Sequence, residues 1–300
     1  MSKLGIDVSS YNGAVNWKKV KSAGYDFACI KIIRKDMGKD TAFERNWVGC
    51  KDAGMDIYGV YNYSYATTTT KAVKDANAVI NALAGRKTTV WLDVEDKCQK
   101  GLNQLLIDII LAYKEVIEHS GNKFGIYTGQ SFYNSYLKPW INQLKGIKFW
   151  IARYGLNNGK KDVKYQPQIN NLLVWQYTSK GKVDGIEGLV DLNVSYDDAW
   201  FKTTVVTVDS SDNKSVKNPY KEPTRLLKYR IPNMRGEDVK WVQFELVHKG
   251  FLPSTNSKGR TNVDGVLGKD TRDAILRYQE SVGITKDGII GQDTRKYLKK

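Results

Sequence analysis

Hydrophobic and polar positions in about the first 200 residues alternate between two patterns. Short apolar, β-branched runs, typical of buried strands, occur at 4–8, 27–32, 57–65, 89–94, 123–127, 149–154, 172–177 and 189–194. Between them, helical periodicity appears near 15–23, 43–54, 70–84, 101–120 and 131–136. This alternation predicts a parallel sheet with crossover helices, and the number of strands fits a (β/α) barrel short of helices in its last third.

The pattern changes after residue 202, so the predicted barrel domain is 1–202. Residues 203–223 are polar, rich in Ser and Asn, and lack a helical period. They are expected to form a linker, although 204–208 fits an edge strand equally well.

A repeat marks the remaining segment, 224–300. Residues 264–272 return as residues 287–295, with six of nine positions identical. In each copy Asp-Gly predicts a turn, and Asp-Thr is expected to cap the helix that follows. With helices predicted over 239–249, 271–282 and 294–298, this is a small three-helix domain. It holds no plausible catalytic cluster, which favours a binding role.

Composition narrows the chemistry. The net charge of +15 favours polyanionic partners, including an anionic cell wall. The basic residues are scattered among acidic ones, so nucleic acid is not an expected partner. Cys29, Cys50 and Cys98 are odd in number and irregularly spaced, which argues against disulfides and thiolate metal sites. The two histidines, His119 and His248, are too few for a histidine-rich zinc site, and His119 lies in a charged helical segment typical of a surface. Neither a metal nor an organic cofactor is expected.

The most informative motif is the run Trp91-Leu92-Asp93-Val94-Glu95, where a buried strand ends in two acids. Side chains alternate along a strand, so Asp93 and Glu95 should share a face. Neighbouring carboxyls shift each other's pKa apart, and such pairs perform glycoside hydrolysis. A lone Asp-x-Glu is more often a solvated loop. In a barrel, however, chemistry sits at the carboxyl ends of strands. Asp7 ends the first strand and Asp191 lies in the last, so four acids are expected at one mouth.

Aromatic residues cluster at the same strand ends. Each alone is more readily explained by packing, but beside acids they predict a cleft in which sugar faces stack on rings. The candidate substrate-binding residues are Tyr61, Tyr63, Tyr127, Trp175 and Tyr177.

Several blocks, in family order, resemble the glycoside hydrolase family 25 lysozymes. They are GIDVS at 5–9, GVY at 59–61, WLDVE at 91–95, GIYT at 125–128, WQYT at 175–178, VDGI at 183–186 and VDLN at 190–193. Residues 225–300 are similar to the peptidoglycan-binding domain 1 family, through its DG-x-x-G-x-x-T signature.

The resemblance implies an α/β fold, a flattened (β/α)5(β)3 TIM-like barrel followed by the three-helix domain. It also implies an N-acetylmuramidase that hydrolyses the β-1,4 bond between N-acetylmuramic acid and N-acetylglucosamine in peptidoglycan. Glu95 matches the general acid, Asp93 the partner carboxylate, and Asp7 and Asp191 the other acids of the cleft. Asn62 departs from the family, which often places histidine there.

Several alternatives remain open at this point. A phage-type endolysin and a bacterial autolysin share this build, and an N-acetylglucosaminidase, a chitinase or a non-catalytic wall-binding protein would use a similar barrel. Retaining, inverting and substrate-assisted mechanisms all fit. The start of the chain lacks the pattern of a signal peptide, and the longest apolar window, 105–113, is too short to span a membrane. Synthesis in the cytoplasm and release by a separate pore protein are therefore expected, without membrane insertion.

Overall fold

A computed structural model describes residues 2–202, 218–249, 251–252 and 260–299 and divides the chain into two compact units, 1–207 and 208–300. Most of the expected linker, including the candidate strand at 204–208, lies outside the described residues. No helix in the described part of the chain is long and apolar enough to cross a membrane.

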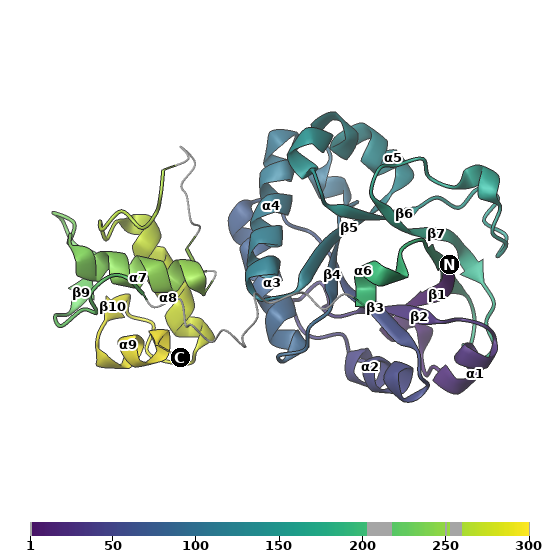
Figure 1. Ribbon diagram of the computed structural model, residues 1–300, viewed down its shortest axis with the longest axis horizontal. Coiled ribbons are helices and arrows are strands. Elements are labelled where there is room, and N and C mark those ends of the chain that lie inside the picture. The colour runs from purple at the N-terminus through teal and green to yellow at the C-terminus, as the bar shows by residue number, and fades with distance from the viewer. Residues whose placement is uncertain (1, 203–217, 250, 253–259, 300) are drawn as a thin grey trace. The chain divides into compact units, whose positions relative to one another are not determined.

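The first unit is a closed eight-stranded barrel (Figure 1). Its strands, in spatial and chain order, are β1 (Lys3–Val8), β2 (Phe27–Lys31), β3 (Asp56–Tyr63), β4 (Thr89–Asp93), β5 (Lys123–Gly129), β6 (Lys148–Ala152), β7 (Leu172–Gly181) and β8 (Val190–Ser195). The helices that follow the first five strands are α1 (Trp17–Ser22), α2 (Phe43–Asp52), α3 (Thr69–Leu83), α4 (Gln104–His119) and α5 (Gln130–Phe132), the last continued by a π-helical turn at Tyr133–Leu137. These helices lie outside the ring of strands. The predicted (β/α)5(β)3 fold is confirmed.

One strand of the sheet differs from the prediction. The pairs from β1–β2 through β6–β7 are parallel, but β8 runs antiparallel to both β7 and β1. Residues 182–189 join β7 to β8 without a crossover helix, and such a short connection reverses the chain direction. The first residues of β8 therefore lie at the same mouth as the carboxyl ends of β1–β7, and this places Asp191 there.

Aromatic side chains fill the barrel interior beneath that mouth. Trp91 and Trp150 are buried there with their rings edge to face, and the Trp91 indole donates to the carbonyl of Tyr58 at 3.0 Å. A Cβ at Gly125 would lie 2.3 Å from the Trp91 ring, so only glycine fits there. A short helix that was not predicted, α6 (Asp198–Lys202), follows β8 and stacks Phe201 on Tyr58. The floor of the mouth is thus a packed layer.

The layer between the strands and the helices is mostly hydrophobic and contains a buried acid on α3. α3 and α4 pack together, with Ala72, Ala76 and Val79 of α3 among the buried residues. Asp75 lies among them and is only 3% exposed. Its Oδ1 has no hydrogen-bond partner in the described structure, and burial raises its pKa to about 6.

The second unit has three helices in its described part, α7 (Glu237–His248), α8 (Lys269–Ser281) and α9 (Gln292–Leu298). The unit also contains a two-stranded antiparallel sheet, in which β9 (Leu227–Lys228) pairs with β10 (Ile289–Ile290). Residues before 224, expected in the linker, contact this unit: Asn218 donates to the carbonyl of Trp241 at 3.0 Å, and Tyr220 packs against the core.

A buried glutamine from the preceding helix contacts each copy of the repeat. Gln243 donates to Asp264 at 2.8 Å and accepts the N–H of Gly265 at 2.8 Å. Gln279 makes the same two bonds, to Asp287 at 2.9 Å and from Gly288 at 2.8 Å. Each glutamine therefore holds its Asp-Gly turn against a helix.

The expectation that Asp-Thr caps the following helices is wrong. α8 and α9 begin after Gly268 and Gly291, and neither start has a side-chain cap. The threonines lie inside the helices, where Thr271 accepts from Gln243 at 3.1 Å and Thr294 from Gln279 at 3.2 Å.

Candidate active site

A cavity of about 380 Å³ opens at the barrel mouth. All eight strands or the loops that follow them contribute side chains to it, most of them polar or aromatic. The lining is Asp7, Ser9, Tyr11, Asn12, Lys31, Tyr61, Tyr63, Asp93, Tyr127, Trp150, Tyr154, Gln176, Leu189 and Asp191. Three of the four predicted acids lie on this one cavity.

The two acids at the end of β4 differ in their surroundings. Asp93 is the last residue of the strand and is 4% exposed, and its Oδ1 has no hydrogen-bond partner among the described residues. Burial and the charge of Glu95 raise the pKa of Asp93 well above its usual range, while Lys31 opposes the shift. Because the Asp93 side chain lines the cavity, its carboxyl group can accept a hydrogen bond from a substrate N–H group there.

Glu95 lies two residues beyond Asp93 and is half-buried. It is not among the residues that line the cavity, but its carboxylate accepts the backbone N–H of Gly129, the last residue of the adjacent strand β5. Burial raises its pKa, and the negative charges of Asp191 and Asp96 add to the shift, against the hydrogen bond from Gly129. A carboxyl group with a raised pKa suits proton donation.

Asp7 and Asp191 are direct partners across the antiparallel β1–β8 pair. Residues paired in this way have Cβ atoms about 4.5–5.5 Å apart, so the two carboxyl groups interact. Burial, and then the charge of Asp191, raise the pKa of Asp7 well above its usual range, and burial raises the pKa of Asp191 to about 6. The two acids therefore do not ionise independently.

Sequence reasoning missed the residues that hold Asp7. Its Oδ2 accepts a hydrogen bond from the side-chain amide of Gln176 at 2.8 Å and another from Asn193 at 2.8 Å. The Oε1 of Gln176 in turn accepts hydrogen bonds from the hydroxyl groups of Tyr127 at 2.9 Å and Tyr154 at 2.7 Å. Strand parity could have found both amides, because Asn193 lies two residues from Asp191 and Gln176 is a polar residue within a buried strand.

The predicted aromatic residues divide between two places. Tyr61, Tyr63 and Tyr127 line the cavity, but Trp175 and Tyr177 do not. These two flank Gln176, and alternation turns them to the opposite face of β7, where their rings pack edge to face and line a different pocket. The five aromatic residues therefore do not share the single cleft that was expected: three line the cavity and two line the other pocket. Asn62 also lies outside the cavity lining; it is buried and donates to the carbonyl of Tyr63 at 3.1 Å.

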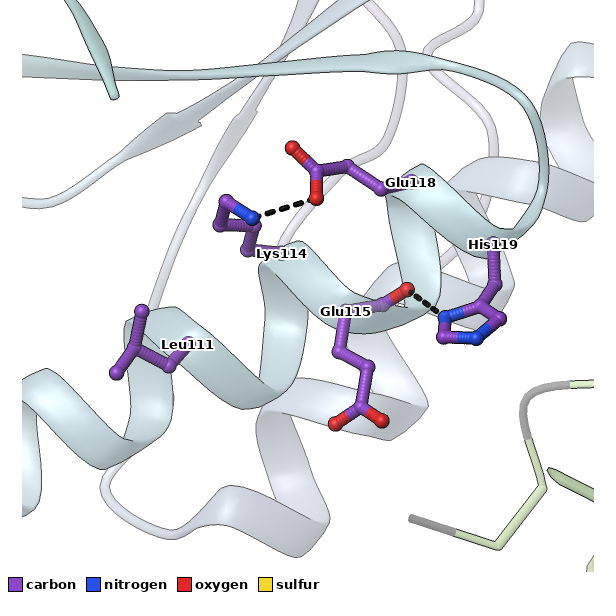
Figure 2. A pocket seen from close by; sticks show the side chains of 5 residues that line it. All are labelled: Leu111, Lys114, Glu115, Glu118 and His119. Atoms are coloured by element: carbon purple, nitrogen blue, oxygen red, sulfur yellow. Dashed lines mark hydrogen bonds and ion pairs between the residues drawn. The ribbon is translucent and has the colours of Figure 1, made fainter. Parts of the chain in front are cut away.

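A shallow depression on the outer side of α4 has no features of a catalytic site (Figure 2). Its lining is Leu111, Lys114, Glu115, Glu118 and His119, all on one helix. The ring of His119 is exposed, and its Nδ1 lies 2.8 Å from the carbonyl oxygen of Glu115. No cysteine that the structure describes lines the depression, so it does not pair a thiol with this histidine. This arrangement agrees with a surface histidine. Within the described ranges, no group of three or more His, Cys, Asp or Glu residues is placed to hold a metal ion.

A barrel that gathers carboxyl groups and tyrosines at its mouth is the architecture of a glycoside hydrolase. The family model described as glycosyl hydrolases family 25 matches residues 6–186, and the chain belongs to this family. A second model, described as a putative peptidoglycan binding domain, matches residues 235–298.

Individual relatives agree with this assignment. An autolytic lysozyme of Clostridium acetobutylicum is 27% identical over 293 residues, covering 97% of this chain and 76% of the relative. Lysozyme M1 of Streptomyces globisporus is 27% identical over 202 residues, covering 63% of this chain and 66% of the relative. Among solved structures, the catalytic domain of endolysin ply40 from bacteriophage P40 of Listeria monocytogenes matches with 28% identity and a TM-score of 0.53. That match covers 66% of this chain and 95% of the other.

Proposed function

We propose that this glycoside hydrolase is a cell-wall lytic N-acetylmuramidase that cleaves the β-1,4 bond between N-acetylmuramic acid and N-acetylglucosamine in peptidoglycan. The observation that carries the proposal is the set of carboxyl groups at the mouth of a family 25 barrel, with Asp7, Asp93 and Asp191 on one cavity and Glu95 beside it. The lysozyme and autolysin relatives support the same activity.

Glu95 is proposed as the general acid that protonates the leaving glycosidic oxygen. The physical support is its raised pKa, caused first by burial and then by neighbouring negative charges. A group of this kind retains its proton to a higher pH than a solvated glutamate and can transfer it as the bond breaks.

Asp93 is proposed to act through the substrate. Its carboxyl group, which lines the cavity, would accept a hydrogen bond from the N–H of the 2-acetamido group on the sugar whose glycosidic bond is cleaved. The acetamido oxygen would then be held for attack on the anomeric carbon, and the carboxylate would stabilise the positive charge that forms. Asp7 and Asp191 line the same cavity, and Gln176 is a positioning residue that ties Asp7 to two tyrosines.

The second unit is proposed to bind the same polymer. It matches a putative peptidoglycan binding domain, and the autolytic lysozyme that is similar over 97% of this chain supports that ligand class. A second binding unit on one chain raises the effective concentration of the barrel at its substrate without any new contact in the cavity.

The bond cleaved is tested by digesting purified peptidoglycan with the full-length protein, reducing the new ends with borohydride and analysing the sugars by mass spectrometry. Reduced N-acetylmuramic acid at the new ends is the expected product. Reduced N-acetylglucosamine would replace the proposal by an N-acetylglucosaminidase activity. No new reducing ends would contradict the glycosidase function and leave the second unit as the functional part.

A further inference from the structure

A second pocket adjoins the cavity and has no part in the chemistry described so far. Its volume is about 230 Å³, and it lies between the loop after β6 and the outer face of β7. The lining residues are Tyr154, Leu156, Asn158, Lys160, Lys161, Asp162, Tyr165, Trp175 and Tyr177. Tyr154 belongs to both places, because it also lines the catalytic cavity and its hydroxyl donates to Gln176 at 2.7 Å.

The loop that forms the outer wall is fixed to the barrel. The side chain of Asn157 accepts the Thr178 hydroxyl at 2.8 Å and the Ser179 N–H at 2.9 Å. Gly155 has a φ of +52°, and a Cβ there would lie 2.2 Å from the Tyr165 ring, so the loop backbone packs directly on that ring. A wall held by these contacts preserves the shape of the pocket before any ligand arrives.

Positive side chains outnumber negative ones at the rim of this pocket. Lys164 pairs with Asp162 at 2.9 Å, and this leaves that carboxylate neutralised. Lys160 and Lys161 are exposed, and neither forms an ion pair with another residue that the structure describes. The pocket therefore presents two free ammonium groups above an aromatic floor.

We propose that this pocket receives the anionic peptide stem attached to the muramic acid whose glycosidic bond is cleaved. The inference rests on the proposed muramidase function and names a specificity element for it. The stem leaves the sugar through the lactyl ether, beside the reacting ring, so it needs a site next to the catalytic cavity. Tyr154 supplies this continuity. The stem carries free carboxylates for the two lysines and small aliphatic side chains for the exposed Leu156.

A further sugar of the glycan chain fits the pocket less well. Stacking of a sugar needs an open ring face, but Trp175 is 1% and Tyr177 is 5% exposed. The glycan backbone is also neutral, because the carboxyl group of its muramic acid is amide-linked to the stem. It offers no partner for Lys160 and Lys161, whereas the stem does.

The test compares two soluble substrates with the full-length protein: glycan oligomers with intact stems, and the same oligomers after an N-acetylmuramoyl-L-alanine amidase has removed the stems and the lactyl carboxyl groups freed by that cleavage have been converted to neutral amides. The quantity measured is the ratio of kcat/KM on the first substrate to kcat/KM on the second. The double variant Lys160→Gln with Lys161→Gln should lower this ratio about three- to tenfold, as expected for two solvent-exposed ion pairs. In the unmodified protein, added salt should lower the ratio in the same direction.

The matched control is Lys18→Gln with Lys138→Gln, which removes the same charge from exposed positions that line neither the pocket nor the catalytic cavity. Its ratio should equal that of the unmodified protein. An unchanged ratio in the Lys160 and Lys161 variant would overturn the inference. If both kcat/KM values fell equally, the two lysines would belong to a glycan subsite instead. If the unmodified protein cleaves neither substrate, the proposed function itself fails.

Discussion

Replacing Asp75 by asparagine should stabilise the barrel at neutral pH. Asp75 is buried between α3 and α4, and its folded-state pKa of about 6 exceeds its ordinary value of 3.8 because burial disfavours the charged form. A pKa that differs by one between the folded and unfolded states corresponds to about 1.4 kcal/mol of stability. Ionised Asp75 therefore costs the folded barrel up to about 3 kcal/mol, and asparagine removes the charge.

The effect of this substitution depends on pH. Below pH 3.8 the carboxyl group is protonated in both the folded and the unfolded states, so it carries no charge penalty. Between 3.8 and about 6 the folded state binds more protons, so stability falls as pH rises, and above about 6 the cost is constant. The gain in free energy of unfolding for Asp75→Asn should accordingly grow from near zero at about pH 3.5 to its full value by about pH 7.

Urea unfolding followed by tryptophan fluorescence measures this gain, because seven of the eight tryptophans precede residue 203 and report on the barrel. Asp52→Asn, an exposed acid on α2, is the matched control and should change stability little at any pH. A gain for Asp75→Asn that stays constant from about pH 4 to about pH 7 would show that the charge of Asp75 is not its cause, since a buried charge must produce a pH-dependent difference.

Three further predictions concern the second unit and the mechanism. Gln279→Leu should destabilise the second unit by about 1–3 kcal/mol, because the N–H of Gly288 and the carboxylate of Asp287 lose a buried hydrogen-bond partner. Thermal unfolding measures this loss of stability, and Gln292→Leu, at an exposed position, is the control. The substrate-assisted route predicts that the product retains the anomeric configuration of the substrate, which NMR spectra of fresh digests measure. A covalent glycosyl adduct trapped on Asp93 would contradict this route. Deleting residues 218–300 should slow lysis of intact walls more than cleavage of soluble fragments, and equal losses in the two assays would argue against a targeting role.

Most of the fold is predictable from the sequence because the strand and helix patterns are strong in the barrel. The direction of β8 was missed because the pattern of a single strand carries no direction; the length of the connection at 182–189 is the only local signal. The prediction for Trp175 and Tyr177 failed for a different reason. Their aromatic character suggested a place in the cleft, but side chains alternate along β7, and these two lie on the face opposite to Gln176.

The supporting residues of the site were harder to predict. Asp7 depends on Gln176 and Asn193, which lie 169 and 186 positions away along the chain, so only the closed barrel brings them together. The glutamines of the second unit show the same limit. The repeat identified its Asp-Gly turns, but Gln243 and Gln279 lie outside the repeated nine residues and are joined to them by tertiary contacts.

The proposed mechanism depends above all on Glu95 as the donor of the proton that breaks the glycosidic bond. This role is measured by the rate at which new reducing ends form on purified peptidoglycan, compared between the unmodified protein, Glu95→Gln and Glu115→Gln. The last makes the same chemical change on α4, away from the mouth. With circular dichroism showing all three folded, we expect a loss of at least about 100-fold for Glu95→Gln and normal activity for Glu115→Gln. Activity in folded Glu95→Gln close to that of the unmodified protein would contradict the role of Glu95 as general acid.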